Sequence, residues 1–257
     1  MLMDDLAYAN RLRRVHPAEK AIFAILCLMA SLLARSPIVP LLVLLVMSLV
    51  ALGVARIPFG AWLRISLLPV GFLLVGGLSL AVDIGTPQGA WSLPLGRGLS
   101  LCTTPQGLRL AVHVTARSLG CTAAMLFLAA TTPLTDLIQL LRWGRVPDFV
   151  IEMLTISYRA LFILLETAGQ MQRAQASRLG YSSFRTSLRS LGQMVSHLFG
   201  RSLQRADLAW NAMLSRGYGE VLCVLPPEYR VSPGRALAGA GVGLGLLLLA
   251  LFLPGGW

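Results

Sequence analysis

The chain has 257 residues, of which 56% are hydrophobic and only 13% are charged. A soluble domain is usually about 45–50% apolar and about 25% charged, so this balance excludes a disordered protein, a coiled coil and an ordinary cytosolic enzyme. Lysine and arginine together number 22 against 11 acidic residues. That excess fits the cytoplasmic loops of a membrane protein, whereas nucleic-acid binding is disfavoured because no soluble basic domain is present to carry it.

Apolar runs in the first half of the chain predict four membrane-spanning helices, since about 20 apolar residues cross a bilayer. They cover residues 21–34, 38–55, 65–82 and 107–130. The first run is short for a span, but Lys20 and Arg35 at its ends can extend their charged groups to the interface. Residues 83–106 are rich in proline and glycine and predict a loop. Residues 1–133 thus form the predicted N-terminal transmembrane region.

Residues 134–235 differ from this region, because 167–219 carry seven arginines and one acid, Asp207. Two helical periodicities predict two long amphipathic helices here, each about 25 residues and roughly 38 Å long. The small and apolar stripes are Met153, Ser157, Ala160, Leu164, Ala168 and Met171 on the first helix, and Leu191, Val195, Leu198, Ser202, Ala206, Ala209 and Met213 on the second. On the first helix, Glu152, Arg159, Glu166 and Arg173 predict a charged face that meets water or a partner.

The last apolar run, 236–253, predicts a fifth span within a C-terminal transmembrane segment, 236–257. Its alternating Gly239, Gly241, Gly243 and Gly245 fit either close helix packing or a generic glycine-rich span. The excess of basic residues in cytoplasmic loops places the N-terminus and 134–235 inside, and the charge-poor 83–106 loop outside. Five spans satisfy every basic cluster except Arg35. We therefore expect an all-α, multi-pass integral membrane protein with two amphipathic helices on the cytoplasmic side.

Each predicted amphipathic helix ends in a similar phrase, in which serine and arginine precede glycine and tyrosine. The phrases are Ala176-Ser177-Arg178-Leu179-Gly180-Tyr181 and Leu214-Ser215-Arg216-Gly217-Tyr218-Gly219. Ordinary helix C-termini explain either phrase alone, because arginine suits the helix dipole and glycine supplies the cap. Their repetition favours a second interpretation, in which two exposed arginine tips bind two sockets on partner proteins.

The sequence lacks the patterns of the common catalytic and metal sites. A phosphate-binding P-loop needs a lysine, and the only one, Lys20, follows Glu19. Neither HExxH nor GxSxG occurs, and His16, His113 and His197 lie in different segments. The four cysteines are far apart in the sequence, so we interpret them as small apolar residues in or near membrane helices. They are Cys27, Cys102, Cys121 and Cys223. We predict no catalytic residue and no metal ligand in this chain.

Several segments carry a resemblance to a known family. They are 3–12, 15–20, Thr131-Thr132-Pro133 with Asp136-Leu137, the stretch from Tyr158 through Glu166 to Arg178, and Ala212-Met213-Leu214-Ser215-Arg216-Gly217-Tyr218. With these residues the chain resembles the T component of cobalt energy-coupling-factor transporters, the CbiQ type, over nearly its whole length. The paired arginine motifs are the most specific part of the resemblance, and the opening phrase is what points to cobalt.

The resemblance implies a non-catalytic scaffold in the bacterial cytoplasmic (inner) membrane. It would join two ATP-binding cassette ATPase subunits to a small substrate-binding membrane subunit, and so couple ATP hydrolysis to cobalt uptake and cobalamin biosynthesis. The partners would bind ATP and metal, so this chain would hold no cofactor and would contact only proteins and membrane lipid.

In the family each arginine motif, usually Ala-Arg-Gly, docks into a groove on one ATPase. Carried over, the motifs are Ser177-Arg178-Leu179 and Ser215-Arg216-Gly217. The first departs from the pattern at both flanks and the second at one. Because Leu179 replaces glycine, we expect a differently shaped first contact.

Other functions stay open at the level of sequence. A nickel or vitamin importer uses the same scaffold, so the substrate is not fixed. An integral membrane enzyme needs a polar constellation at one membrane face, and a stand-alone carrier or channel needs polar residues lining the spans or a repeated half. Neither pattern is evident, and dependence on partners distinguishes a scaffold from both.

Overall fold

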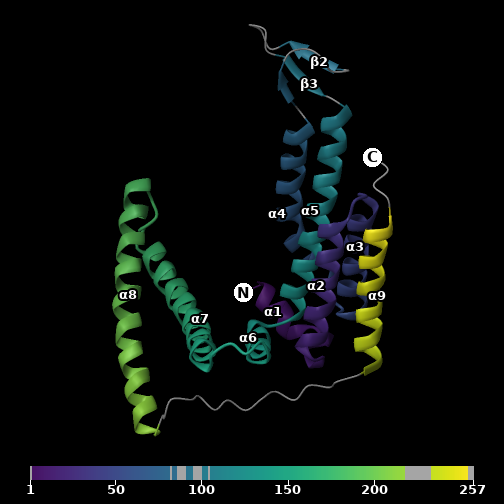
Figure 1. The fold of residues 1–257 in the computed structure, drawn as a ribbon. Helices are drawn as coiled ribbons and strands as arrows, with labels where there is room; N and C mark the ends of the chain where they lie inside the picture. Colours follow the sequence, from purple (N-terminus) through teal and green to yellow (C-terminus); the bar gives the residue numbers. More distant parts are fainter. Residues whose placement is uncertain are drawn as a thin grey trace. The chain divides into compact units, whose positions relative to one another are not determined.

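The protein is described by a computed structural model that covers residues 2–81, 83–85, 91–94, 100–103, 105–217 and 233–253 (Figure 1). The helices in this part of the chain are α1 (Leu2–Ala9), α2 (Pro17–Leu33), α3 (Ile38–Leu49), α4 (Phe59–Ala81), α5 (Pro105–Thr131), α6 (Leu134–Trp143), α7 (Asp148–Ser177), α8 (Phe184–Ser215) and α9 (Pro233–Phe252). A 3-10 turn, Arg11–Arg14, follows α1, and a π-helical turn, Val50–Val54, continues α3.

The chain forms two compact units. The first comprises Met1–Leu137 together with Pro227–Trp257, and the second comprises Ile138–Pro226. The first unit therefore contains α1 to α5 and α9, and the second contains α7 and α8. Each unit is described by itself below.

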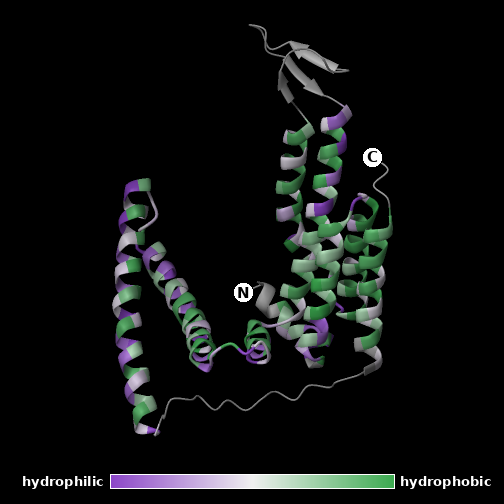
Figure 2. Cartoon of the chain, viewed as in Figure 1, coloured by the Kyte–Doolittle hydropathy of each residue, from purple (hydrophilic) through white to green (hydrophobic). Residues whose placement is uncertain are grey.

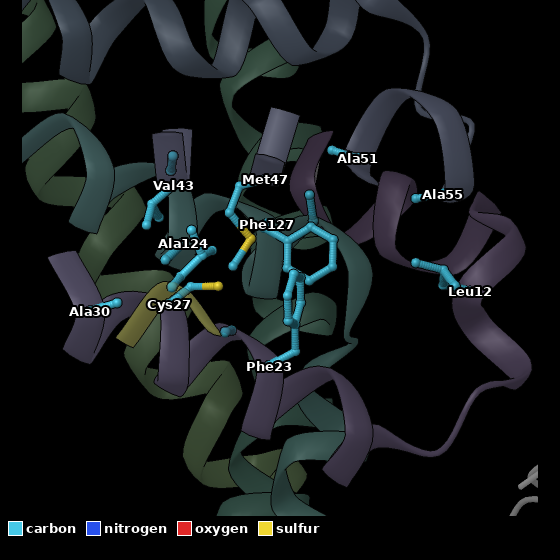
Figure 3. Packing of buried hydrophobic residues seen from close by; sticks show 14 of the residues in the cluster. Leu12, Phe23, Cys27, Ala30, Val43, Met47, Ala51, Ala55, Ala124 and Phe127 are labelled. Atoms are coloured by element: carbon cyan, nitrogen blue, oxygen red, sulfur yellow. The ribbon is translucent and has the colours of Figure 1, made fainter. Parts of the chain in front are cut away.

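Helix α5 is central to the first unit, because α2, α3 and α4 all pack against it, and α2 also packs against α9 (Figure 1). The buried core is built mainly from small side chains with a few large ones between them (Figure 3). Phe23 and Phe127 meet edge to face in this core, with ring centroids 5.8 Å apart. Cys27, Ala30 and Ala124 belong to the same buried cluster, and such small side chains let the helices approach closely.

Two glycines show how close that approach is. A Cβ added at Gly120 on α5 would lie 2.8 Å from the carbonyl oxygen of Pro40 and would also meet the hydroxyl of Ser31. A Cβ added at Gly243 on α9 would lie 2.9 Å from the Cβ of Leu26. Close packing of the glycine-rich last helix is therefore confirmed at Gly243, whereas Gly241 has open space around it.

A polar junction is buried where the N-terminal segment meets the end of α5. The amide of Asn10 donates to the carbonyl oxygens of Ala130 and Thr131 at 3.1 and 3.3 Å. The ammonium of Lys20, just before the apolar run 21–34, donates to Leu12 and Thr131 at 3.2 and 3.0 Å. Burial lowers the pKa of Lys20 to about 8, and the nearby carboxylates of Asp136 and Glu19 partly offset that shift.

The helix boundaries differ from the predicted ones where local signals set them. All predicted apolar runs are helical, but α2 begins at Pro17 and α4 at Phe59, ahead of the apolar residues. Two short helices, α1 and α6, were not predicted, because polar and charged residues interrupt their apolar residues before a long run forms.

The prediction of a loop at 83–106 was wrong in part. Three short strands lie there: β1 (Asp83–Gly85), β2 (Trp91–Pro94) and β3 (Ser100–Thr103). They pair antiparallel in the order β1-β3-β2, with Asp83 opposite Cys102 and Trp91 opposite Thr103. The strands were not predicted, because each has only three or four residues and the segment is rich in proline and glycine, which indicate loops.

Two helices in the described part of the chain are long and apolar enough to cross a membrane, Phe59–Ala81 and Pro105–Thr131. Two more are apolar but shorter, Ile38–Val54 and Leu237–Phe252. Figure 2 shows mostly apolar residues along α3, α4 and α9, whereas polar and apolar residues mix along α7 and α8. The count of five spans stays a prediction.

Candidate partner-coupling site

The second unit is dominated by two long helices, α7 with 30 residues and α8 with 32. Both are longer than the sequence periodicity predicted. The start of α8 is fixed by a capping box, in which the Ser183 hydroxyl accepts from the Thr186 N–H and the Ser183 N–H donates to the Thr186 hydroxyl. This cap satisfies backbone donors that the first turn leaves free, so the helix begins at Phe184.

A hydrogen-bonded elbow joins the end of α7 to the second turn of α8. The side-chain amide of Gln175 donates to the backbone oxygen of Ser190 at 2.9 Å and accepts from the hydroxyl of Tyr181 at 2.7 Å. The hydroxyl of Ser190 donates to the backbone oxygen of Gly180 at 2.9 Å. A Cβ at Gly180 would lie 2.8 Å from that hydroxyl, so the elbow closes only over glycine. This network was not predicted, although Gln175, Gly180 and Tyr181 lie in or beside the first arginine phrase.

Arg178 is the C-cap residue of α7, with φ −97° and ψ 16°. Leu179 follows it with φ 58°, and Gly180 closes the turn by donating its N–H to the carbonyl oxygen of Gln175 at 2.9 Å. This pattern is a Schellman motif, in which a left-handed residue ends the helix. The expectation that glycine supplies this cap was wrong here, because Leu179 rather than Gly180 occupies the left-handed position.

Arg216 is the C-cap residue of α8 in almost the same conformation, with φ −96° and ψ 10°. Gly217 follows it with φ 72°, and its N–H donates to the carbonyl oxygen of Leu214 at 3.0 Å. Here glycine occupies the left-handed position as expected.

The serines before the two arginines also behave alike. The hydroxyl of Ser177 donates to the carbonyl oxygen of Ala174 at 2.9 Å, and that of Ser215 donates to Ala212 at 3.0 Å. The repeated phrase of the sequence therefore folds into a repeated local structure. We call the segments 177–179 and 215–217 the α7 tip and the α8 tip.

Both guanidinium groups are exposed, and neither has a hydrogen bond or ion pair within the described part of the chain. Each lies at the C-terminus of a long helix, where carbonyl groups without partners carry partial negative charge. Helix α8 separates the two tips: its 32 residues span about 48 Å at 1.5 Å per residue. One protein socket cannot hold both arginines, so the tips suit two separate sockets.

The predicted faces of α7 and α8 agree only in part with the observed burial of their side chains. Glu152, expected on a charged face, is buried, whereas Arg159, Glu166 and Arg173 are exposed as expected. Most of the stripe along α8 has no covering in the second unit, since Leu191 and Val195 are exposed. The described residues contain no group of three or more histidine, cysteine or acidic side chains able to hold a metal ion.

Comparison with known proteins identifies the family. The family model for CbiQ, described as a cobalt transport protein, matches residues 9–223. The chain belongs to this family. The cobalt transport protein CbiQ of Rhodobacter capsulatus is 35% identical over 234 residues, which cover 90% of this chain and 90% of that protein.

Two further relatives extend the comparison. CbiQ of Salmonella typhimurium is 33% identical over 209 residues, covering 79% of this chain and 90% of that protein. A protein of Methanocorpusculum labreanum whose name describes a fused cobalt transport protein, CbiMQ, is 28% identical over 246 residues, covering 92% of this chain and 40% of that protein. The resemblance to the CbiQ family is thus confirmed, and with it a membrane component of cobalt transport.

Proposed function

We propose that this chain is the transmembrane scaffold, or T component, of an energy-coupling-factor importer for cobalt. It couples ATP hydrolysis by two partner ATPase subunits to metal uptake through a separate substrate-binding membrane subunit. The chain is multi-pass in the cytoplasmic (inner) membrane, with five spans and α7 and α8 on the cytoplasmic side. It binds neither ATP nor metal itself, and Ser177, Arg178, Leu179, Ser215, Arg216 and Gly217 contact the ATPases.

The observation that carries this proposal is the structural equivalence of the two tips. Arg178 and Arg216 share one backbone conformation, are both exposed, and lie at opposite ends of α8. A guanidinium has five donors in a fixed fork and stays charged, so it suits a socket of carboxylates and carbonyls. Two equivalent tips on one scaffold favour a partner protein that is itself present in two copies.

The elbow restricts how motion could pass through the scaffold. Because Gln175 and Gly180 are hydrogen-bonded to Ser190, the α7 tip is fixed to the first turns of α8. The spacing of the two arginines then follows the length of a single helix. When ATP binding changes the distance between the sockets, α8 must tilt or bend as a rod, and this movement reaches the substrate-binding partner as a rigid-element switch.

The relatives support a metal-binding partner. The name of the Methanocorpusculum labreanum protein describes CbiM and CbiQ in one fused chain, and the present chain covers only 40% of its length. We propose that the part of that protein which the present chain does not match corresponds to the partner that captures cobalt. Uptake assays with cobalt and nickel in parallel distinguish the two metals as substrates of the complex.

The test is purification of the tagged chain from native membranes in mild detergent, with the Arg178→Glu, Arg216→Glu variant in parallel. The wild type should bring two ATPase copies and a small membrane protein, and the variant should lose the ATPases. Charged hydrogen bonds contribute about 1.5–3 kcal/mol each, so each single substitution should weaken binding roughly tenfold to a hundredfold.

The matched control is Arg201→Glu with Arg205→Glu, which makes the same charge change at exposed positions in the interior of α8. This variant should keep its ATPases. If it loses them as well, binding follows net charge rather than the tips. If the wild type purifies alone, or the tip variant retains the ATPases, the scaffold proposal fails.

A further inference from the structure

Leu179 combines two features that reduce the stability of the free chain. Its φ of 58° lies in the left-handed region, which is less favourable than the right-handed conformation for a residue with a Cβ. Its side chain is also 75% exposed, so the apolar group gains little from folding. Both costs would disappear if glycine stood at this position.

The α8 tip shows that glycine can stand there. Gly217 occupies the equivalent position with φ 72°, and Arg216 before it has nearly the same backbone conformation as Arg178. The helix cap itself makes no use of the leucine side chain, because the Schellman motif is closed by the N–H groups of Leu179 and Gly180.

The other non-glycine residues with positive φ in the described chain are Arg56 and Arg145. Both are exposed arginines, whose charged groups benefit from water. Leu179 is the only apolar residue among these three, and exposure to water does not stabilise its side chain as it does a charged group. Residues held in such backbone conformations cluster at active sites, ligand clamps and switch regions.

We propose that Leu179 is a contact residue that inserts into an apolar pocket beside the arginine socket of an ATPase subunit. The two tips then have different binding chemistry, since the α7 tip presents an arginine with a leucine and the α8 tip an arginine with a glycine. This inference rests on the proposed function, and it adds a second contact to the first of the two sockets.

The position of Leu179 next to Arg178 in the chain also supports contact with the ATPase subunit. The Cα atoms of neighbouring residues are 3.8 Å apart, so a protein surface that surrounds the guanidinium of Arg178 also comes within reach of Leu179. The leucine has no other covering in the second unit, where it is among the most exposed large apolar side chains. The interface of the α7 tip therefore continues onto it.

The experiment measures the affinity of purified ATPase subunit for the chain in lipid nanodiscs, together with the melting temperature of each variant. Leu179→Met keeps an apolar side chain and should bind within about threefold of the wild type. Leu179→Ala and Leu179→Asn should bind about tenfold to a hundredfold more weakly, because the apolar contact is lost.

Leu179→Gly separates binding from folding. It removes the left-handed strain as well as the side chain, so its melting temperature should rise while its affinity for the ATPase falls. A residue with only a structural role cannot produce that combination. Arg178→Glu is measured in the same series, and its failure to reduce binding would contradict the scaffold function rather than the role of Leu179.

Two results would overturn the proposal for Leu179. The first is wild-type affinity of both the alanine and the asparagine variants while Arg178→Glu abolishes binding. The second is a loss that occurs in nanodiscs but not in detergent micelles, which would assign the leucine to the lipid surface.

Discussion

At the scale of single residues, the buried polar junction of the first unit explains why the only lysine of the chain lies at the start of α2. Lys20 has 4% exposure, and its ammonium donates to the carbonyl oxygens of Leu12 and Thr131. It thereby joins the segment before α2 to the end of α5. The sequence placed Lys20 at the end of a span but did not show this role, because its acceptors are backbone atoms 8 and 111 residues away.

We predict that Lys20→Met lowers the melting temperature of the purified chain. The substitution removes two hydrogen bonds from a buried ammonium, to Leu12 and Thr131, and takes a nearby cation from Asp136. A hydrogen bond from a charged group contributes about 1.5–3 kcal/mol. Arg35→Met is the matched control, since it removes an exposed cation just beyond the other end of the same helix. Equal melting temperatures for the two variants would show that the junction contributes nothing.

At the scale of elements, α5 owes its central position to small residues at the points where other helices cross it. Gly120 is the tightest of these points, with Ser31 and Pro40 in its immediate surroundings. The sequence predicted α5 from its apolar run, since length and hydropathy are local properties. It did not predict which glycine faces a neighbour, because that depends on the crossing of helices far apart in the chain.

Gly120→Ala should therefore destabilise the first unit by about 1–3 kcal/mol, because the added Cβ would meet backbone that cannot move away. Gly71→Ala on α4 is the control: nothing lies within 4 Å of its added Cβ, and alanine favours a helix by about 1 kcal/mol over glycine. Thermal unfolding in detergent measures both. A stable Gly120→Ala variant would mean that α2 and α3 do not pack as described.

At the scale of the whole molecule, composition and charge predict how the chain is oriented in the membrane. Arginine gathers in 167–219 and is scarce in 83–106. Because cytoplasmic loops carry an excess of basic residues, the first segment is predicted to lie in the cytoplasm and the second outside. The two candidate spans α4 and α5 flank the second segment.

Accessibility to a membrane-impermeant thiol reagent tests this orientation in a chain whose four cysteines are replaced by alanine. Gln106→Cys, an exposed position at the start of α5, should react in intact cells. Gln204→Cys, exposed on α8, should react only after the cells are permeabilised. Reaction of both in intact cells would place α8 outside and contradict the proposed docking to cytoplasmic ATPases.

The sequence by itself determined the helical class, the apolar runs and the two arginine phrases, because each depends on residues close together in the chain. Tertiary structure decided what local signals do not contain. It placed Leu179 rather than Gly180 in the left-handed turn, buried Glu152 on a face expected to be charged and exposed, and paired short strands in a predicted loop. It also joined Gln175 and Ser190 into the elbow, since hydrogen bonds between two helices form only once the turn between them has folded.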